Sequence, residues 1–140
     1  MARTSIRKPQ DTKTILLVED DDDLRAELVE YLRTPRLIVV ACSCLAEARA
    51  QLTEYARGPT ALHAIICDVG LPDGSGIDFY VSHAGRTPTS RWILMSGSHD
   101  RIYLDGQLEK AHALSAPLVV EKPVPLRTLR GLIDDGPRDR

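Results

Sequence analysis

The fold is decided by one stretch of sequence, Ala64-Ile65-Ile66-Cys67-Asp68-Val69-Gly70-Leu71-Pro72-Asp73-Gly74-Ser75-Gly76. Its first half is a short apolar run, typical of a buried strand, and the run ends on the carboxylate of Asp68. The second half is rich in Gly and Pro, so it cannot continue the strand but can fold around a ligand. Ligands of open α/β sheets bind outside the carboxyl ends of the strands. The position of Asp68 therefore indicates chemistry rather than packing.

Four further apolar runs predict additional strands, at residues 14–18, 37–41, 92–95 and 118–120. The segments between them carry apolar residues at helical spacing, as Leu24, Leu28 and Leu32 do. We expect Asp22 or Asp23 to cap the first helix and Ser43 the second. The fourth helix is expected to place Leu104 and Leu108 on one face. Five strands alternating with five helices predict an α/β domain with a doubly wound parallel sheet and helices on both faces.

Composition agrees with a single globular domain. The chain has 140 residues, of which 43% are hydrophobic and 27% charged, enough to bury a core. A net charge of −2 argues against direct binding of nucleic acid. No apolar run approaches the roughly 20 residues that span a bilayer. Three cysteines and no secretory signal favour a cytoplasmic protein with reduced thiols. We expect residues 1–13 to be a disordered leader and residues 134–140 a charged tail.

Four of the five predicted strands end on chemically useful side chains. Glu19 and Asp20 follow the first strand, Asp68 the third, Ser96 the fourth and Lys122 the fifth. Because parallel strands end at one edge, these groups can converge. Clustered carboxylates repel one another unless a cation lies between them, and oxygen ligands suit Mg²⁺. A hydroxyl and an ammonium group nearby can hold phosphoryl oxygens. The pattern predicts a Mg²⁺-dependent phosphoryl site with Asp68 as nucleophile.

The chain resembles the response-regulator receiver domains of two-component signalling over residues 14–133, which suggests a flavodoxin-like receiver fold. The resemblance rests on four motifs, each at a predicted strand end: Ile15-Leu16-Leu17-Val18-Glu19-Asp20-Asp21, Asp68-Val69-Gly70-Leu71-Pro72-Asp73-Gly74-Ser75-Gly76, Leu94-Met95-Ser96-Gly97 and Val120-Glu121-Lys122-Pro123. It implies a phosphoprotein that accepts a phosphoryl group from a sensor histidine kinase or a phosphotransfer protein. It further implies a conformational change read by a downstream protein, without an enzymatic role. Association of two copies of the chain stays open.

The resemblance also assigns roles to individual residues. Asp68 is the implied phosphoacceptor, Ser96 hydrogen-bonds the new phosphoryl group, and Lys122 pairs with its charge. The implied Mg²⁺ ligands are Asp20, Asp68 and the Gly70 carbonyl, with Glu19 acting through water. Lys122-Pro123 matches a position where the family commonly has a cis peptide.

The sequence departs from the family pattern at a position that takes part in passing the signal to other proteins. The family often has an aromatic residue three positions before the lysine, whereas this chain has Val119. The aromatic switch is therefore absent, and signalling from the adjoining surface is expected to differ. The chemistry of Asp68 is unaffected.

Other readings of these residues remain. A Mg²⁺-dependent phosphatase with an aspartyl-phosphate intermediate usually has a second aspartate two positions after the nucleophile, where this chain has Gly70. A receiver-like scaffold that is never phosphorylated would not need the full set of Asp20, Asp68, Ser96 and Lys122. Cys42 and Cys44 with His63 could suggest zinc, but their spacing differs from that of common structural sites. Asp73 is expected to serve the turn at residues 72–74.

Overall fold

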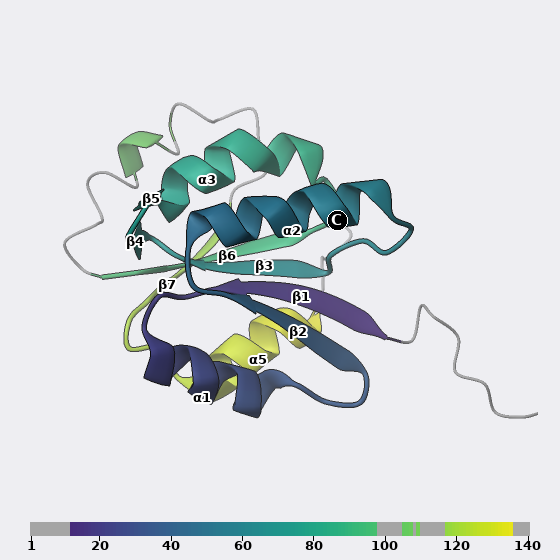
Figure 1. Ribbon diagram of the computed structural model, residues 1–140. Coiled ribbons are helices and arrows are strands. Elements are labelled where there is room, and N and C mark those ends of the chain that lie inside the picture. Colours follow the sequence, from purple (N-terminus) through teal and green to yellow (C-terminus); the bar gives the residue numbers. More distant parts are fainter. Residues whose placement is uncertain (1–11, 98–104, 108, 110–116, 136–140) are drawn as a thin grey trace, which may run out of the picture.

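A five-stranded parallel sheet with strand order β2-β1-β3-β6-β7 forms the centre of the protein (Figure 1). The computed structural model describes residues 12–97, 105–107, 109 and 117–135. The strands are β1 (Lys13–Val18), β2 (Leu37–Cys42), β3 (Ala64–Asp68), β6 (Arg91–Ser96) and β7 (Leu118–Glu121). Each contains one of the five predicted runs, and β3 occupies the central position. The predicted parallel sheet is confirmed.

Helices cover both faces of this sheet (Figure 1). Helices α1 (Asp22–Leu32) and α5 (Leu126–Asp135) lie on one face, and α2 (Leu45–Arg57) and α3 (Gly76–His83) on the other. A short 3₁₀ helix, η2 (Ala84–Arg86), follows α3. None of the helices in the described part of the chain is long and apolar enough to cross a membrane.

Alternate side chains of each strand enter opposite halves of the core. Ile15 and Leu17 of β1 pack in the cluster that contains Leu28 of α1 and Leu129 of α5. Leu16 and Val18 of the same strand belong to the cluster under α2 and α3. Strands covered on both faces need apolar residues at nearly every position, which explains why these runs are continuous rather than alternating.

The segment after β3 forms a small hairpin of β4 (Gly70–Leu71) and β5 (Gly74–Ser75) before α3 begins. Gly76 closes it, because its N–H donates to the Val69 carbonyl at 2.8 Å. A Cβ atom at Gly76 would lie 2.2 Å from the Asp68 carbonyl oxygen. Only glycine permits this close approach, so the segment after β3 turns back immediately beside Asp68.

The predicted helix caps were wrong in detail. Asp21 caps α1, since its side chain accepts a hydrogen bond from the Leu24 N–H. Cys44, not Ser43, is the N-cap residue of α2, and its side chain makes no capping hydrogen bond. The fourth predicted helix is represented by helical residues 105–107 and 109, whereas Leu104 and Leu108 lie outside the described residues.

Candidate functional site

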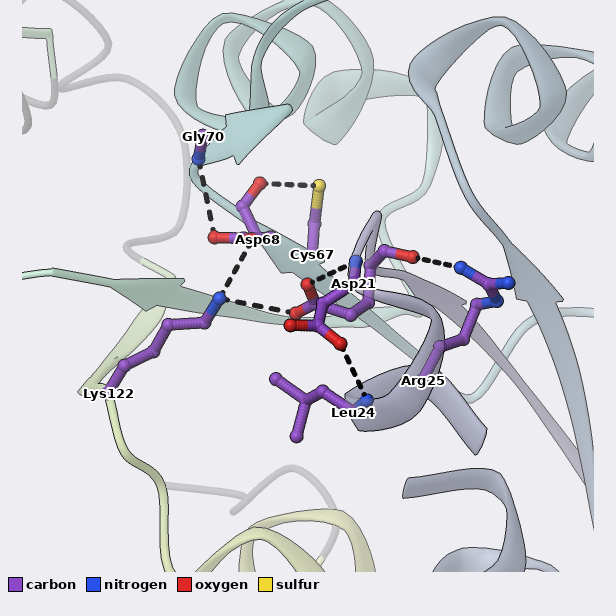
Figure 2. A network of polar contacts seen from close by, with 8 residues as sticks. Asp21, Leu24, Arg25, Cys67, Asp68, Gly70 and Lys122 are labelled. Carbon is purple, nitrogen blue, oxygen red and sulfur yellow. Dashed lines mark hydrogen bonds and ion pairs between the residues drawn. The ribbon is translucent and has the colours of Figure 1, made fainter. Parts of the chain in front are cut away.

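The carboxyl edge of the sheet brings together three of the predicted site residues, two carboxylates and the ammonium group between them (Figure 2). Lys122, which directly follows β7, places its Nζ 2.8 Å from Asp68 Oδ2 and 3.3 Å from Glu19 Oε1. Asp68 ends β3 and Glu19 directly follows β1. Lys122 and Asp68 are 54 residues apart in sequence, and the parallel sheet makes them neighbours.

Three carboxylates converge at this edge. Oxygens of Glu19, Asp20 and Asp68 lie within 4.8 Å of one another. Glu19 is fully buried and Asp68 is 6% exposed, whereas Asp20 faces solvent. Glu19 Oε2 accepts a hydrogen bond from the Asp21 N–H at 3.0 Å. Its Oε1 is buried and lies in the ion pair with Lys122, with no further partner among the described atoms. The oxygen-only set and this buried oxygen fit a hard cation such as Mg²⁺.

Burial and neighbouring charges together shift the pKa values of Glu19 and Lys122. Burial, reinforced by the nearby charge of Asp68, raises the pKa of Glu19, although the Asp21 N–H and Lys122 oppose this shift. Burial alone would lower the pKa of Lys122. The hydrogen bond and negative charge of Asp68, together with Glu19, outweigh burial and raise it. Lys122 is therefore held as a cation between two carboxylates, as an anion-stabilising group must be.

Arg25 of α1 holds the loop that carries Glu19 (Figure 2). Its Nη1 donates to the Glu19 carbonyl at 2.9 Å. Its Nη2 lies 2.7 Å from Asp22 Oδ1. The sequence analysis did not identify this residue. Its spacing from Asp22 could have revealed the ion pair on the helix, but not the contact with the Glu19 main chain.

Asp68 is restrained on its other side by its own loop. The Gly70 N–H donates to Asp68 Oδ1 at 3.3 Å, and Cys67 Sγ lies 3.3 Å from the Asp68 carbonyl oxygen (Figure 2). Burial raises the pKa of the Cys67 thiol well above its ordinary value and that of Cys42 to about 11. Both thiols are therefore protonated and unreactive at neutral pH. Within the described ranges, the candidate cation cluster contains carboxylates alone.

Ser96 and Val119 are two further positions that the sequence analysis singled out. Ser96 is 1% exposed, and its carbonyl accepts a hydrogen bond from the Lys122 N–H at 2.9 Å. No described hydrogen bond joins the Ser96 hydroxyl to Asp68 or Lys122. The Lys122-Pro123 peptide is cis, as the resemblance implied. Val119 is half-buried opposite Leu94, so a small side chain occupies the position that is often aromatic in the family.

A doubly wound sheet in which the first strand lies between the second and third, with charged groups at its carboxyl edge, defines the flavodoxin-like class. The sequence matches the family model of the response regulator receiver domain over residues 15–134. The chain therefore belongs to the response regulator receiver domain family. Members of this family are generally signalling domains of two-component systems rather than enzymes, and they bind Mg²⁺ at an acidic pocket.

Solved receiver domains have the same fold. The CheY-like receiver domain from Methanospirillum hungatei JF-1 shares 21% identity with a TM-score of 0.73, over 89% of this chain and 92% of that chain. The receiver domain from Clostridium thermocellum shares 21% identity with a TM-score of 0.73, over 88% of this chain and 92% of that chain. The beryllofluoride-activated NtrC4 receiver domain dimer shares 22% identity with a TM-score of 0.69, over 89% of this chain and 95% of that chain. Comparison with curated proteins gave no match.

Proposed function

We propose that residues 14–133 form a receiver that accepts a phosphoryl group on Asp68 from a phosphohistidine and passes the signal to a downstream protein. The donor is a sensor histidine kinase or a phosphotransfer protein. One observation carries this proposal: Lys122 contacts both Asp68 and Glu19 at a sheet edge where three carboxylates converge. A strand-end nucleophile, a cation and clustered oxygen ligands are the parts that phosphoryl transfer requires.

The residues divide the chemistry between them. An Asp68 oxygen forms the new bond to phosphorus as the phosphorus–nitrogen bond of the donor breaks, leaving the donor imidazole. Lys122 and the Gly70 N–H, which already contact the two Asp68 oxygens, can meet the charge of the phosphoryl group. Glu19, Asp20, Asp68 and the Gly70 carbonyl would hold Mg²⁺, which neutralises charge on the transferring group. Ser96 is the proposed donor to a phosphoryl oxygen.

A groove beside the site supports a protein as phosphodonor. It has a volume of about 490 Å³, reaches Lys122 and is mainly apolar. Its lining residues come from α1, β6 and the segment that leads into α5: Leu24, Glu27, Leu28, Met95, Lys122, Pro123, Val124 and Leu126. A donor that covers this groove would bring its phosphohistidine to the edge that holds Asp68 while excluding water from the reaction.

Phosphorylation can be tested without knowing the natural donor. The protein is incubated with acetyl phosphate and Mg²⁺ and its intact mass is measured. We expect one added phosphoryl group in the native protein and none in Asp68→Asn. Asp23→Asn is the matched control, since it removes an exposed carboxylate in the first turn of α1, outside the cation cluster. A phosphoryl group that persists in Asp68→Asn would exclude Asp68 as the acceptor.

Binding of Mg²⁺ can be tested separately by amide chemical shifts and thermal unfolding. We expect Mg²⁺ to raise Tm, because it binds the folded state and relieves repulsion among the carboxylates. Asp20→Asn should weaken this response. The fluorescence of Trp92 is a poor reporter, because Trp92 lies near the opposite end of β6, roughly 13 Å from Ser96 at about 3.3 Å per residue. An unchanged response in Asp20→Asn would place the cation elsewhere.

A further inference from the structure

Asp73 connects the phosphoacceptor loop, residues 69–75, to a helix far from it in sequence. Its Oδ1 accepts a hydrogen bond from the Leu45 N–H at 2.9 Å, and its Oδ2 accepts one from the Ala46 N–H at 3.0 Å. These are the first residues of α2, whose own N-cap side chain makes no hydrogen bond. Asp73 therefore supplies the cap of α2 from 28 residues away.

The contact between loop and helix includes packing as well as hydrogen bonds. Gly74 has φ +149°, and a Cβ atom there would lie 2.9 Å from Leu45 Cδ1. Leu45 is 1% exposed and belongs to the same core cluster as Val69, at the start of the loop. The hydrogen bond from Leu45, reinforced by that from Ala46 and by the charge of Arg49, lowers the pKa of Asp73. The charged carboxylate is thus the form that this contact favours.

The same loop is tied to Asp68 near its start and directly after its end. The Gly70 N–H donates to Asp68 Oδ1 near the start, and Gly76 follows the loop in close contact with the Asp68 carbonyl. The hairpin between them has strands of only two residues, too short to hold a fixed position alone. The position of the Gly70 N–H therefore depends on how the tip of the loop is anchored, and Asp73 provides that anchor.

We infer that Asp73 is a positioning residue for phosphoryl acceptance, holding the loop against α2 so that the Gly70 N–H stays directed at Asp68. This inference rests on the proposed function. It has a second consequence: a change in the state of Asp68 is transmitted through Asp73 to the first turn of α2. The Leu45 and Ala46 amides report that transmission directly, because they are the donors.

The test compares Asp73→Ala with Glu47→Ala. Glu47 supports the same end of α2, since its Oε1 accepts from the Ser43 N–H at 2.7 Å and the Ser43 hydroxyl at 3.1 Å, but it has no described hydrogen bond to the loop. The rate of phosphorylation by acetyl phosphate is measured at saturating Mg²⁺. We expect Asp73→Ala to be about tenfold slower, since small misplacements at a reacting centre have effects of this size. Glu47→Ala should stay within about twofold of the native rate, and Asp73→Asn should recover much of it, because Asn also caps helices well.

Amide shifts give a second readout that helix stability alone would not change. Adding beryllofluoride should shift the Leu45 and Ala46 amides in the native protein and in Glu47→Ala, but not in Asp73→Ala. If Asp73→Ala is phosphorylated at the native rate, or Glu47→Ala is slowed equally, the positioning role is wrong and the receiver function stands. If the native protein gains no phosphoryl group on Asp68, the proposed function itself fails.

Discussion

Two loops lie at the same edge of the sheet and are held in different ways. The loop between β1 and α1 is stabilised mostly by near neighbours in sequence: Glu19 with Asp21, Asp21 with Leu24, and Arg25 with Glu19, the widest of these spanning 6 residues. Glu19 also has distant partners, in its ion pair with Lys122 and in the hydrogen bond from its N–H to the Cys42 carbonyl. The loop between β3 and α3 is held from afar. Asp68 pairs with Lys122 across 54 residues, and Asp73 reaches α2 across 28.

The difference shows which half of the site depends on the whole fold. Most contacts of the first loop form together with α1, and the ion pair with Lys122 is an exception. The loop that follows Asp68 depends more on distant elements, because Lys122, which follows β7, pairs with Asp68 and α2 donates to Asp73. Damage to α1 should therefore affect mainly the first loop, whereas changes at β7 or α2 should reach the loop after β3.

The largest effect is expected from Gly76→Ala, which forces a methyl group against the main chain of Asp68. The added Cβ would lie 2.2 Å from the Asp68 carbonyl oxygen, so the backbone of the acceptor loop must move. We expect a loss of about 3 kcal/mol of stability in urea unfolding, as for other overpacked sites. Gly70→Ala is the matched control, since its Cβ would meet nothing within 4 Å. Equal effects of the two substitutions would show that the close turn is not what requires Gly76.

A smaller loss is expected from Lys122→Met, which keeps an apolar stem but leaves two carboxylates without their cation. We expect about 2 kcal/mol at pH 7 without Mg²⁺, less than for a fully buried pair because the Lys122 side chain is 29% exposed. Arg33→Met, which removes only an exposed 3.7 Å ion pair with Glu30, should change stability by less than about 0.5 kcal/mol.

The loss in Lys122→Met should depend on pH. The pKa of Glu19 is already raised by burial, and removing Lys122 raises it further. The penalty is then full at pH values above the raised pKa, where Glu19 is ionised in the fold. It disappears as the pH falls below the ordinary glutamate pKa of about 4.3, where this carboxyl becomes protonated in the folded and the unfolded state. Urea unfolding at several pH values measures this, and a loss independent of pH would contradict the electrostatic origin.

Asp21→Ala tests the locally held loop. The variant removes the cap of α1 but keeps the Asp21 N–H that donates to Glu19. We expect a loss of about 1 kcal/mol, the usual effect of removing a cap, and an unchanged rate of phosphorylation. Asp23→Ala, in the first turn of the same helix, should change stability by only a few tenths of a kcal/mol, about the size of a helix-dipole effect. A large loss of phosphorylation in Asp21→Ala would mean that the two loops are coupled.

The smallest effect on stability is expected from Asp73→Ala. The pH dependence of this effect shows whether it comes from the Asp73 carboxylate. Because the hydrogen bond from Leu45 lowers the pKa of Asp73, its stabilisation is full above the ordinary aspartate pKa of about 3.9 and is lost as the pH falls through the lower folded value. The stability difference between native protein and Asp73→Ala should shrink over that acid window. The amide in Asp73→Asn does not titrate. The stability difference between Asp73→Asn and Asp73→Ala should therefore stay constant over the same pH range.

Much of the architecture follows from local pattern. Continuous apolar runs such as residues 14–18 predicted strands covered on both faces, and the side chains at their carboxyl ends predicted one shared edge. That edge does bring Glu19, Asp68 and Lys122 together. The roles assigned to these side chains, to Ser96 and to the main-chain and carboxylate Mg²⁺ ligands stay predictions. Helix caps were harder, because adjacent acids such as Asp21, Asp22 and Asp23 have similar local preferences and the backbone angles decide among them.

The sequence by itself therefore determined the order of elements, the parallel sheet and the residues that could meet at its edge, because side-chain periodicity and strand-end position are local properties. Only the tertiary structure decided that Glu19 is fully buried, that Arg25 holds its carbonyl, and that Asp73 caps α2 rather than serving only its own turn. The physical reason is that a carboxylate's partners are set by where distant backbone N–H groups and cations lie after packing, and no spacing along the chain encodes that distance.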